Sequence, residues 1–312
     1  MAGTRPAMTK AGRIVALAQL RYPRPPMTSV RATLIGFSAI LMWSLLALLT
    51  VLSGRVPPFQ LLSMTFAVGG LLGLVWLARA RAWGVLRQPP AVWALGIGGL
   101  AGYHALYFAS LRLAPPAEAG LINYLWPLLI VLFSGLLPGE RLRAKHVVGA
   151  LLGLAGTVAL FTARGATLGL ANWPGYACAF CAAFVWSSYS VLSRRFAGVP
   201  TAAVAGFCVA TALIAATAHG LFETTVWPED PTQWLAVLLL GIGPVGIAFY
   251  VWDIGVKHGD IRLLGVGSYA APVLSTLFLV LAGYAPATAS LGVATLLISG
   301  GGLIAAYERK KK

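Results

Sequence analysis

The sequence predicts an all-α integral membrane protein with ten transmembrane helices, arranged as two inverted five-helix repeats with both termini in the cytoplasm. Three observations lead to this prediction. Hydrophobic residues make up 59% of the 312 residues and charged residues only 10%, a composition outside the range of soluble domains. Short motifs recur in the two halves of the chain. Basic residues collect on one side of the predicted membrane.

Apolar windows of about twenty residues follow one another along the chain, and each is long enough to cross ~30 Å of hydrocarbon as a helix. The short connections leave nearly all backbone polar groups to be satisfied inside helices, as a bilayer requires. The predicted spans cover residues 33–53, 58–78, 91–110, 117–137, 145–163, 173–193, 200–222, 232–252, 263–283 and 287–307.

Two motifs recur between the halves. Trp43-Ser44 matches Trp186-Ser187, 143 residues later, and the Tyr-x-x-Pro of 124–127 matches that of 269–272, 145 residues later. Each half holds five spans, and because five is odd, the second copy must enter the membrane inverted. Inverted repeats are typical of secondary transporters, whose substrate site lies between the repeats near the bilayer midplane. We predict a first repeat over residues 31–165 and a second over residues 170–308.

The formal net charge of +15 fits the positive-inside rule. With the N-terminus in the cytoplasm, all 23 Lys and Arg residues lie on the cytoplasmic side except Arg55, Arg112 and Arg164. The charge therefore indicates topology and requires no nucleic acid partner. Residues 1–30 lack the apolar core of a signal peptide. They are expected to be a disordered basic arm, or a stretch that precedes a start at Met27, and residues 309–312 form a basic tail.

Aromatic and small polar residues cluster near the middle of several spans, where carboxylates are absent. Tyr103 and Tyr107 share one face of the third span with His104 close by, and similar groups occur in the fourth, sixth, eighth and ninth spans. Large apolar faces with single hydrogen-bonding groups suit an aromatic solute that is neutral overall, including a zwitterion. The predicted substrate-binding residues are Tyr103, His104, Tyr107, Asn123, Tyr124, Trp126, Trp186, Tyr250, Ser268 and Tyr269.

Structural roles are the alternative for these residues. Trp and Tyr gather at membrane interfaces regardless of function, and rings in the middle of a span can simply pack in the core. Pro127 and Pro272 stand at matching places in the halves, and each removes a helical hydrogen bond and should kink its span. Paired kinks are candidate hinges for alternating access, or else static bends.

Signs of catalysis or of a bound cofactor are missing from the sequence. It has no H-E-x-x-H, G-x-S-x-G or Walker motif, so no enzyme is predicted. Cys178 and Cys181 form a C-x2-C pair without a second ligand pair, so neither metal nor cofactor is expected. Proton-coupled export of cations usually needs an embedded acid. Glu118, at the outer end of the fourth span, keeps a multidrug or purine exporter working by proton antiport open as the alternative.

The chain resembles the drug/metabolite transporter superfamily, and within it the EamA-type exporters. The residues that carry the resemblance are the Trp-Ser and Tyr-x-x-Pro motifs of both halves, the stretch Tyr103-His104-Ala-Leu-Tyr107, and Gly139-Glu140 after the fourth span. The second half departs from this pattern with Gly283-Tyr284, which has no acid.

The resemblance implies a central cavity built from the third, fourth, eighth and ninth spans and reached alternately from either side. It implies that Tyr103, His104, Tyr107, Tyr124 and Trp126 line this cavity. The expected function is a secondary transporter in the bacterial inner membrane that exports aromatic or large neutral amino acids. Its expected partners are the amino acid and the lipid bilayer, and a monomer can suffice.

Overall fold

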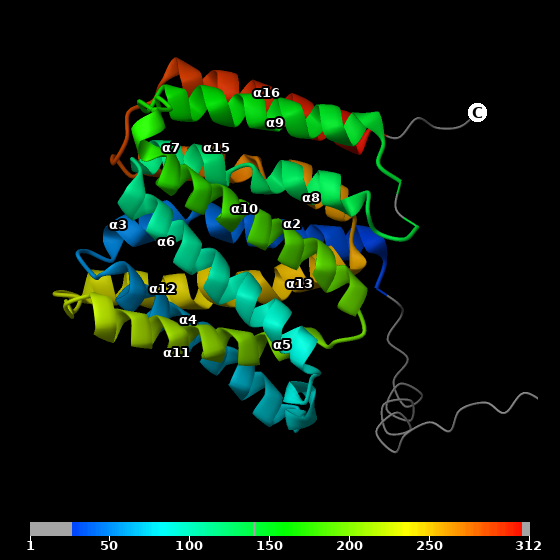
Figure 1. Ribbon diagram of the computed structural model, residues 1–312, viewed down its shortest axis with the longest axis vertical. Helices are drawn as coiled ribbons and strands as arrows, with labels where there is room; N and C mark the ends of the chain where they lie inside the picture. Colours follow the sequence, from blue (N-terminus) through cyan, green and yellow to red (C-terminus); the bar gives the residue numbers. More distant parts are fainter. Residues whose placement is uncertain (1–26, 140, 308–312) are drawn as a thin grey trace, which may run out of the picture.

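The computed structural model describes residues 27–139 and 141–307, and every regular element in these ranges is a helix (Figure 1). Ten helices in the described ranges are long and apolar enough to cross a membrane. The predicted all-α membrane fold is therefore confirmed at this level. Most of the predicted basic arm, the basic tail at 309–312 and Glu140 lie outside the described residues.

Several of the membrane spans are built from two consecutive helices. The first half comprises α2 (Ser29–Ser44) with α3 (Leu46–Leu52), α4 (Pro58–Arg79), α5 (Pro90–Ile97) with the π-helical turn η2 (Gly98–Gly102) and α6 (Tyr103–Leu113), α7 (Pro116–Asn123) with α8 (Trp126–Ser134), and α9 (Ala144–Thr162). The second half comprises α10 (Trp173–Ser193), α11 (Val204–Phe222), α12 (Pro231–Ile242) with the π-helical turn η6 (Gly243–Ile247) and α13 (Ala248–His258), α14 (Ile261–Gly267) with α15 (Ala270–Leu281), and α16 (Ala289–Ala306). The eighth span thus runs six residues beyond its predicted end.

The sequence explains where many helices begin. Proline occupies the first turn of α4, α5, α7 and α12, where its missing N–H has no helical partner to lose. Asp230 caps α12 by accepting a hydrogen bond from the Gln233 N–H at 2.9 Å. Gly139 and Gly283 follow the fourth and ninth spans with φ of 81° and 79°, a conformation that favours glycine.

The fourth and ninth spans break at matching places. α7 ends at Asn123 and α8 begins at Trp126, whereas α14 ends at Gly267 and α15 begins at Ala270. Pro127 and Pro272 therefore lie in the first turn of a new helix, where a proline is tolerated. The chain is interrupted just before each proline rather than bent around it.

The third and eighth spans carry a second matching interruption. The π-helical turns η2 and η6 begin at Gly98 and Gly243, so these spans correspond at an offset of 145 residues. Both turns are rich in glycine, and an extra residue per turn is most easily accommodated there. Residues of α6 and α13 therefore correspond at this offset.

The most extensive helix pairings join the first half to the second. They are α9 with α16, α4 with α11, α2 with α13, and α6 with α10. α9 and α16 run side by side along one edge of the bundle, at the top of Figure 1. The described chain starts and finishes at the same end of the bundle, on the right in that view.

Glycine permits the closest of these pairings. A Cβ atom on Gly149 of α9 would lie 2.5 Å from the carbonyl oxygen of Gly301 in α16, and a Cβ on Gly301 would lie equally close to Gly149. Backbones that approach this closely gain van der Waals contact, which drives helix association in lipid. By contrast, Gly300 has no heavy atom within 4 Å of its added Cβ.

Gly149→Val should therefore force α9 and α16 apart and lower the free energy of unfolding by about 1–3 kcal/mol. Gly300→Val, the matched control on α16, should have a much smaller effect because its side chain meets open space. Thermal unfolding of the purified protein in detergent measures both changes. Equal unfolding midpoints for the two variants would contradict the close α9–α16 contact.

Candidate substrate-binding cavity

A cavity of about 680 Å³ lies between helices of the first half and parts of the eighth and ninth spans. At one end its lining includes the exposed residues Thr50, Pro58 and Pro116, where α3 ends and α4 and α7 begin. At its deep end Trp126 and Trp186 are buried. The cavity is thus open toward one end of the bundle and closed toward the other, and its volume suits a small organic molecule.

Most of the predicted site residues meet in this cavity. Those that line it are Tyr103, His104, Tyr107, Asn123, Tyr124, Trp126 and Trp186. They come from the third, fourth and sixth spans, and helical spacing brings Tyr103 and Tyr107 to the same wall.

The aromatic rings of the cavity are ordered by contacts with one another. The rings of Tyr103 and Tyr107 are stacked, with an interplanar angle of 8° and centroids 6.0 Å apart. At the deep end, Trp43, Trp126 and Trp186 meet edge to face, with centroids 5.6–6.4 Å apart. Offset and edge-to-face arrangements are the favoured ones for aromatic pairs. The rings therefore form stable walls with flat apolar faces.

Few polar groups reach the cavity, and they are neutral. Asn123 Nδ2 donates to the Tyr103 hydroxyl at 3.1 Å, whereas Asn123 Oδ1 is buried without a hydrogen-bond partner among the described residues. His104 Nδ1 lies 2.7 Å from the Leu100 carbonyl oxygen; because a carbonyl only accepts, Nδ1 is the donor. None of the described lining residues is Asp, Glu, Lys or Arg.

The sequence analysis missed other lining residues, several of which are aromatic or carry a hydroxyl group. They include Trp43, Thr50, Thr65, Phe249 and Ser275. Trp43 could have been found, because it is the repeat partner of Trp186. The face of the helix that carries Phe249 depends on the π-helical turn η6, which changes the phase of the eighth span and leaves no signal in the hydrophobic pattern.

Tyr250, predicted as a binding residue, is not among the residues that line the cavity. Its hydroxyl donates to the carbonyl oxygen of Gly69 in α4 at 3.0 Å, and the side chain is buried. At the offset of 143 that relates Trp43 to Trp186, Tyr250 would correspond to Tyr107. The π-helical turns set the offset in these spans at 145, so the position that corresponds to Tyr107 is Trp252.

Ser268 and Tyr269, which were also predicted to bind the substrate, are absent from the lining as well. Ser268 Oγ donates to the Leu264 carbonyl oxygen at 2.7 Å. Tyr269 is fully buried, and its ring packs against Gly153 of α9. Both residues lie at the break between α14 and α15, on the side that packs against the bundle.

Glu118 is held outside the cavity. Its Oε2 accepts hydrogen bonds from the Tyr176 hydroxyl at 2.5 Å and from Asn172 Nδ2 at 3.0 Å, so it ties α7 to the start of α10. Carboxylates that accept several hydrogen bonds are well stabilised as anions. The acid on which the proton-antiport alternative depended therefore anchors two helices and does not face the solute space.

Below the cavity, buried polar contacts close the other end of the bundle. Trp252 Nε1 donates to Ser190 Oγ at 3.1 Å, and Ser187 Oγ donates to the Trp126 carbonyl oxygen at 3.0 Å. Both bonds connect α10 with elements that border the cavity floor.

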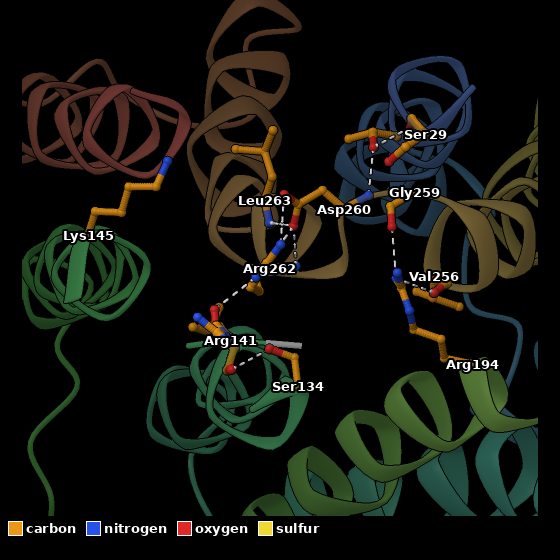
Figure 2. A network of polar contacts seen from close by, with 12 residues as sticks. Ser29, Ser134, Arg141, Lys145, Arg194, Val256, Gly259, Asp260, Arg262 and Leu263 are labelled. Atoms are coloured by element: carbon orange, nitrogen blue, oxygen red, sulfur yellow. Dashed lines mark hydrogen bonds and ion pairs between the residues drawn. The ribbon is translucent and has the colours of Figure 1, made fainter. Parts of the chain in front are cut away.

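Nearer the surface, contacts around Asp260 join the two halves. The Asp260 N–H donates to Thr33 Oγ1 at 2.8 Å, and Arg262 Nη1 donates to the Arg141 carbonyl oxygen at 2.9 Å. Figure 2 shows Asp260 and Arg262 between the loop at Arg141 and the turn at Gly259, where Arg194 Nη1 also donates to the carbonyl oxygen at 2.8 Å. This end of the bundle is therefore closed by polar contacts as well as by rings.

The residues that the structure describes contain no obvious metal site. Among them, no three His, Cys, Asp or Glu side chains gather closely enough to hold an ion. Cys178 and Cys181 are free thiols on α10.

Comparison with known proteins assigns the family. The sequence profile of the EamA-like transporter family matches residues 30–162 and, a second time, residues 173–306. The chain belongs to the EamA-like transporter family. The two matches fall close to the predicted repeats, and membership in a transporter family points to transport rather than catalysis.

Two curated relatives extend this comparison. The chain is 62% identical over 282 residues to the aromatic amino acid exporter YddG of Ancylobacter novellus, covering 89% of this chain and 98% of the relative. It is 29% identical to the aromatic amino acid exporter YddG of Escherichia coli strain K12, covering 89% and 97%. A solved crystal structure with 61% identity superposes with a TM-score of 0.86 over 89% of this EamA-like transporter and 98% of that chain.

Tyr250→Phe should lower the free energy of unfolding by about 0.5–1.5 kcal/mol, because it removes the hydrogen bond to the Gly69 carbonyl oxygen. Tyr284→Phe is the control, since Tyr284 is 55% exposed and should lose little. Thermal unfolding in detergent measures both. If Tyr250→Phe left stability unchanged but weakened solute binding, the assignment of Tyr250 to helix packing would fail.

The Asp260 carboxyl predicts how the stability of the protein changes with pH. Burial raises the pKa of the Asp260 carboxyl, but hydrogen bonds from Arg262 and the Leu263 N–H outweigh this and hold the pKa below its usual range. A depressed pKa adds stability that is present above the unfolded value, about 4, and is lost as pH falls through the lower folded value. Asp260→Ala, which also removes the N-cap of α14, should destabilise the protein by about 1–2 kcal/mol between roughly pH 5 and 8.

Asp260→Asn, the matched variant, retains a capping oxygen and should lose less. Unfolding midpoints in detergent measured over a pH series test both variants. The difference between wild type and Asp260→Ala should shrink below about pH 4. A difference that instead grew in acid would contradict the ionised state assigned to this carboxyl.

Proposed function

We propose that this EamA-like transporter exports aromatic amino acids, and large neutral ones less readily, across the bacterial inner membrane by alternating access. The observation that carries the proposal is a ring-lined cavity of about 680 Å³ without a charged lining residue among those described. A solute that is neutral overall and carries an aromatic ring complements such a surface. Both curated relatives described above are named as aromatic amino acid exporters.

The proposed topology is an inverted repeat with both termini in the cytoplasm. The matching helix breaks, the matching π-helical turns and the pairing of helices across the halves support a two-fold relation between residues 31–165 and 170–308. The distribution of Lys and Arg supports the cytoplasmic placement. In this orientation the open end of the cavity faces outward and the closed end faces the cytoplasm.

Within the cavity, the amino acid ring would stack against Tyr107 and the tryptophans of the deep end. Its ammonium and carboxylate groups would be met by neutral dipoles. The unpartnered Oδ1 of Asn123 is a candidate acceptor for the ammonium, and the hydroxyls of Thr50 and Ser275 are available at the walls. The N-terminus of α8 begins beside Trp126, and its positive end favours a carboxylate.

The proposed conformational change bends the fourth and ninth spans at their breaks. The residues between the paired helices, Tyr124-Leu125 and Ser268-Tyr269, interrupt the regular α-helices of their spans and can absorb rotation. Pro127 and Pro272 would keep the breaks in place because neither can donate a hydrogen bond across them. Opening one end while closing the other would expose the same cavity alternately to each side.

The test is transport by the protein reconstituted in liposomes. Tryptophan, phenylalanine and tyrosine should be carried, whereas glutamate and a lipophilic cation should be carried poorly, with and without a pH gradient. Tyr107→Ala and Trp126→Ala should each reduce tryptophan flux roughly tenfold, the scale expected for losing a stacking partner with its buried area. Trp173→Ala is the control, because Trp173 is 66% exposed at the start of α10.

Wild-type flux in both cavity variants would overturn the assignment of the site. Transport of the lipophilic cation in preference to tryptophan would overturn the proposed substrate class. Flux that depends on a pH gradient would indicate coupled antiport, and flux that ignores it would indicate facilitated diffusion.

A further inference from the structure

A second, much smaller cavity lies at the closed end of the bundle. Its volume is about 20 Å³, enough for about one water molecule. The lining residues that matter here are Leu95, Tyr189, Ser193, Val199, Asp253 and Lys257. In the proposed orientation this cavity lies toward the cytoplasm.

The small cavity is the repeat-related counterpart of the large one. Leu46, Thr50 and Val56 line the large cavity, and 143 residues later stand Tyr189, Ser193 and Val199, which line the small one. The same correspondence holds at the offset of 145 for the third and eighth spans. There, Phe108 of the large cavity corresponds to Asp253, and Leu95 of the small cavity corresponds to Leu240.

These matches identify the small cavity as the collapsed form of a vestibule. The large cavity shows how the same positions are arranged when their end of the bundle is open. If the halves exchange their conformations, the small cavity widens as the large one narrows, as alternating access requires.

The two vestibules differ in charge. In the small cavity, Lys257 Nζ lies 2.9 Å from Asp253 Oδ2, and both side chains are only 4% exposed. Asp253 Oδ2 also accepts from Thr201 Oγ1 at 2.7 Å, and Lys257 also donates to the Val199 carbonyl oxygen at 2.9 Å. The corresponding positions of the large cavity's half are Phe108 and Arg112, and Arg112 lies 3.6 Å from Glu223, which does not line the large cavity. Of the two linings, that of the small cavity contains an acid.

A buried ion pair at this place needs a reason other than stability. Replacing such a pair with apolar residues often leaves a protein as stable or more so, whereas separating the partners leaves two uncompensated charges. Ionisable residues within membrane spans commonly mark solute pathways. Asp253 and Lys257 lie one turn apart on α13, so opening the vestibule would separate them from Thr201 and Val199 rather than from each other. A solute or water must then take the places of Thr201 and Val199.

We propose that Asp253 and Lys257 form the cytoplasmic loading site for a zwitterionic α-amino acid. The α-ammonium of the solute takes the place of the Thr201 hydroxyl beside Asp253, and the α-carboxylate takes the place of the Val199 carbonyl oxygen beside Lys257. Both protein charges are then paired in the closed and in the loaded state. This role presupposes the export of aromatic amino acids proposed above.

Aromatic contacts connect the loading site to the large cavity. Tyr189 lines the small cavity, and its ring lies 5.3 Å from that of Trp186, which lines the large one. The Trp186 ring is in turn stacked on Trp252, the neighbour of Asp253, at 6.2 Å. A solute released by the ion pair would therefore meet aromatic faces as it moves outward.

The test compares the two faces of the membrane. Inside-out and right-side-out vesicles give the tryptophan KM at the cytoplasmic and external faces separately. Asp253→Asn and Lys257→Met should each raise the cytoplasmic KM about tenfold or more, because one solute charge loses its partner. The external KM should change less than about twofold. Arg195→Gln, an exposed basic residue at the same end, should change neither value.

The double variant Asp253→Asn/Lys257→Met distinguishes loading from a purely structural lock. It leaves no unpaired charge, so it should fold even if a single variant does not. If the pair is a loading site, the double variant still lacks both charges that bind the solute, so its cytoplasmic KM should stay raised. Discrimination against tryptamine and indole-3-propionate, which each lack one charged group, should also fall in the double variant.

A wild-type cytoplasmic KM in the double variant would overturn the loading site, as would an equal rise of KM at both faces. Either result could be obtained while wild-type protein still carries tryptophan. Failure of the wild-type protein to carry any amino acid would instead overturn the proposed function, and the loading site with it.

Discussion

Contact between glycines of opposite halves is the constraint on which the rest of the structure depends. Gly36 of α2 meets Gly255 of α13, Gly69 of α4 meets Gly246 of η6, and Gly149 of α9 meets Gly301 of α16. In a bilayer no hydrophobic force pushes helices together, so close packing of backbones must hold them. Since each contact joins the first half to the second, together they fix how the halves face each other.

Among the described residues, this packing leaves a cavity large enough for a solute at one end of the bundle. Where α2 and α13 are in glycine contact, the bundle is closed and filled by tryptophans and polar contacts. Toward the other end, α3, α4, α6 and α7 diverge around the large cavity. A single arrangement of two similar halves thus produces one open and one collapsed vestibule, which is the asymmetry that a carrier must be able to reverse.

Charge is distributed according to the same asymmetry. The large cavity relies on rings and neutral dipoles, whereas the collapsed vestibule contains the buried pair of Asp253 and Lys257. A neutral lining holds a zwitterion without trapping it, since strong charge pairing would slow its release. A charged pair at the opposite end can select for the two charged groups before the ring is recognised. Selection for the two charged groups and recognition of the ring would thus follow one another along one solute path.

The sequence by itself determined the ten helices, most of their boundaries and the division into halves, because hydrophobic length and motif spacing depend only on local order along the chain. It also determined seven of the lining residues, since helical spacing places rings such as Tyr103 and Tyr107 on one face.

Only the tertiary structure decided which half presents its residues to the solute. Tyr269 corresponds to Tyr124 in sequence, yet Tyr269 packs on Gly153 while Tyr124 lines the cavity. Likewise, the π-helical turns make Trp252 rather than Tyr250 the counterpart of Tyr107. The hydrophobic pattern gives no sign of these turns. The physical reason is that equivalent positions of two similar halves have different surroundings whenever one end of the bundle is open and the other is closed.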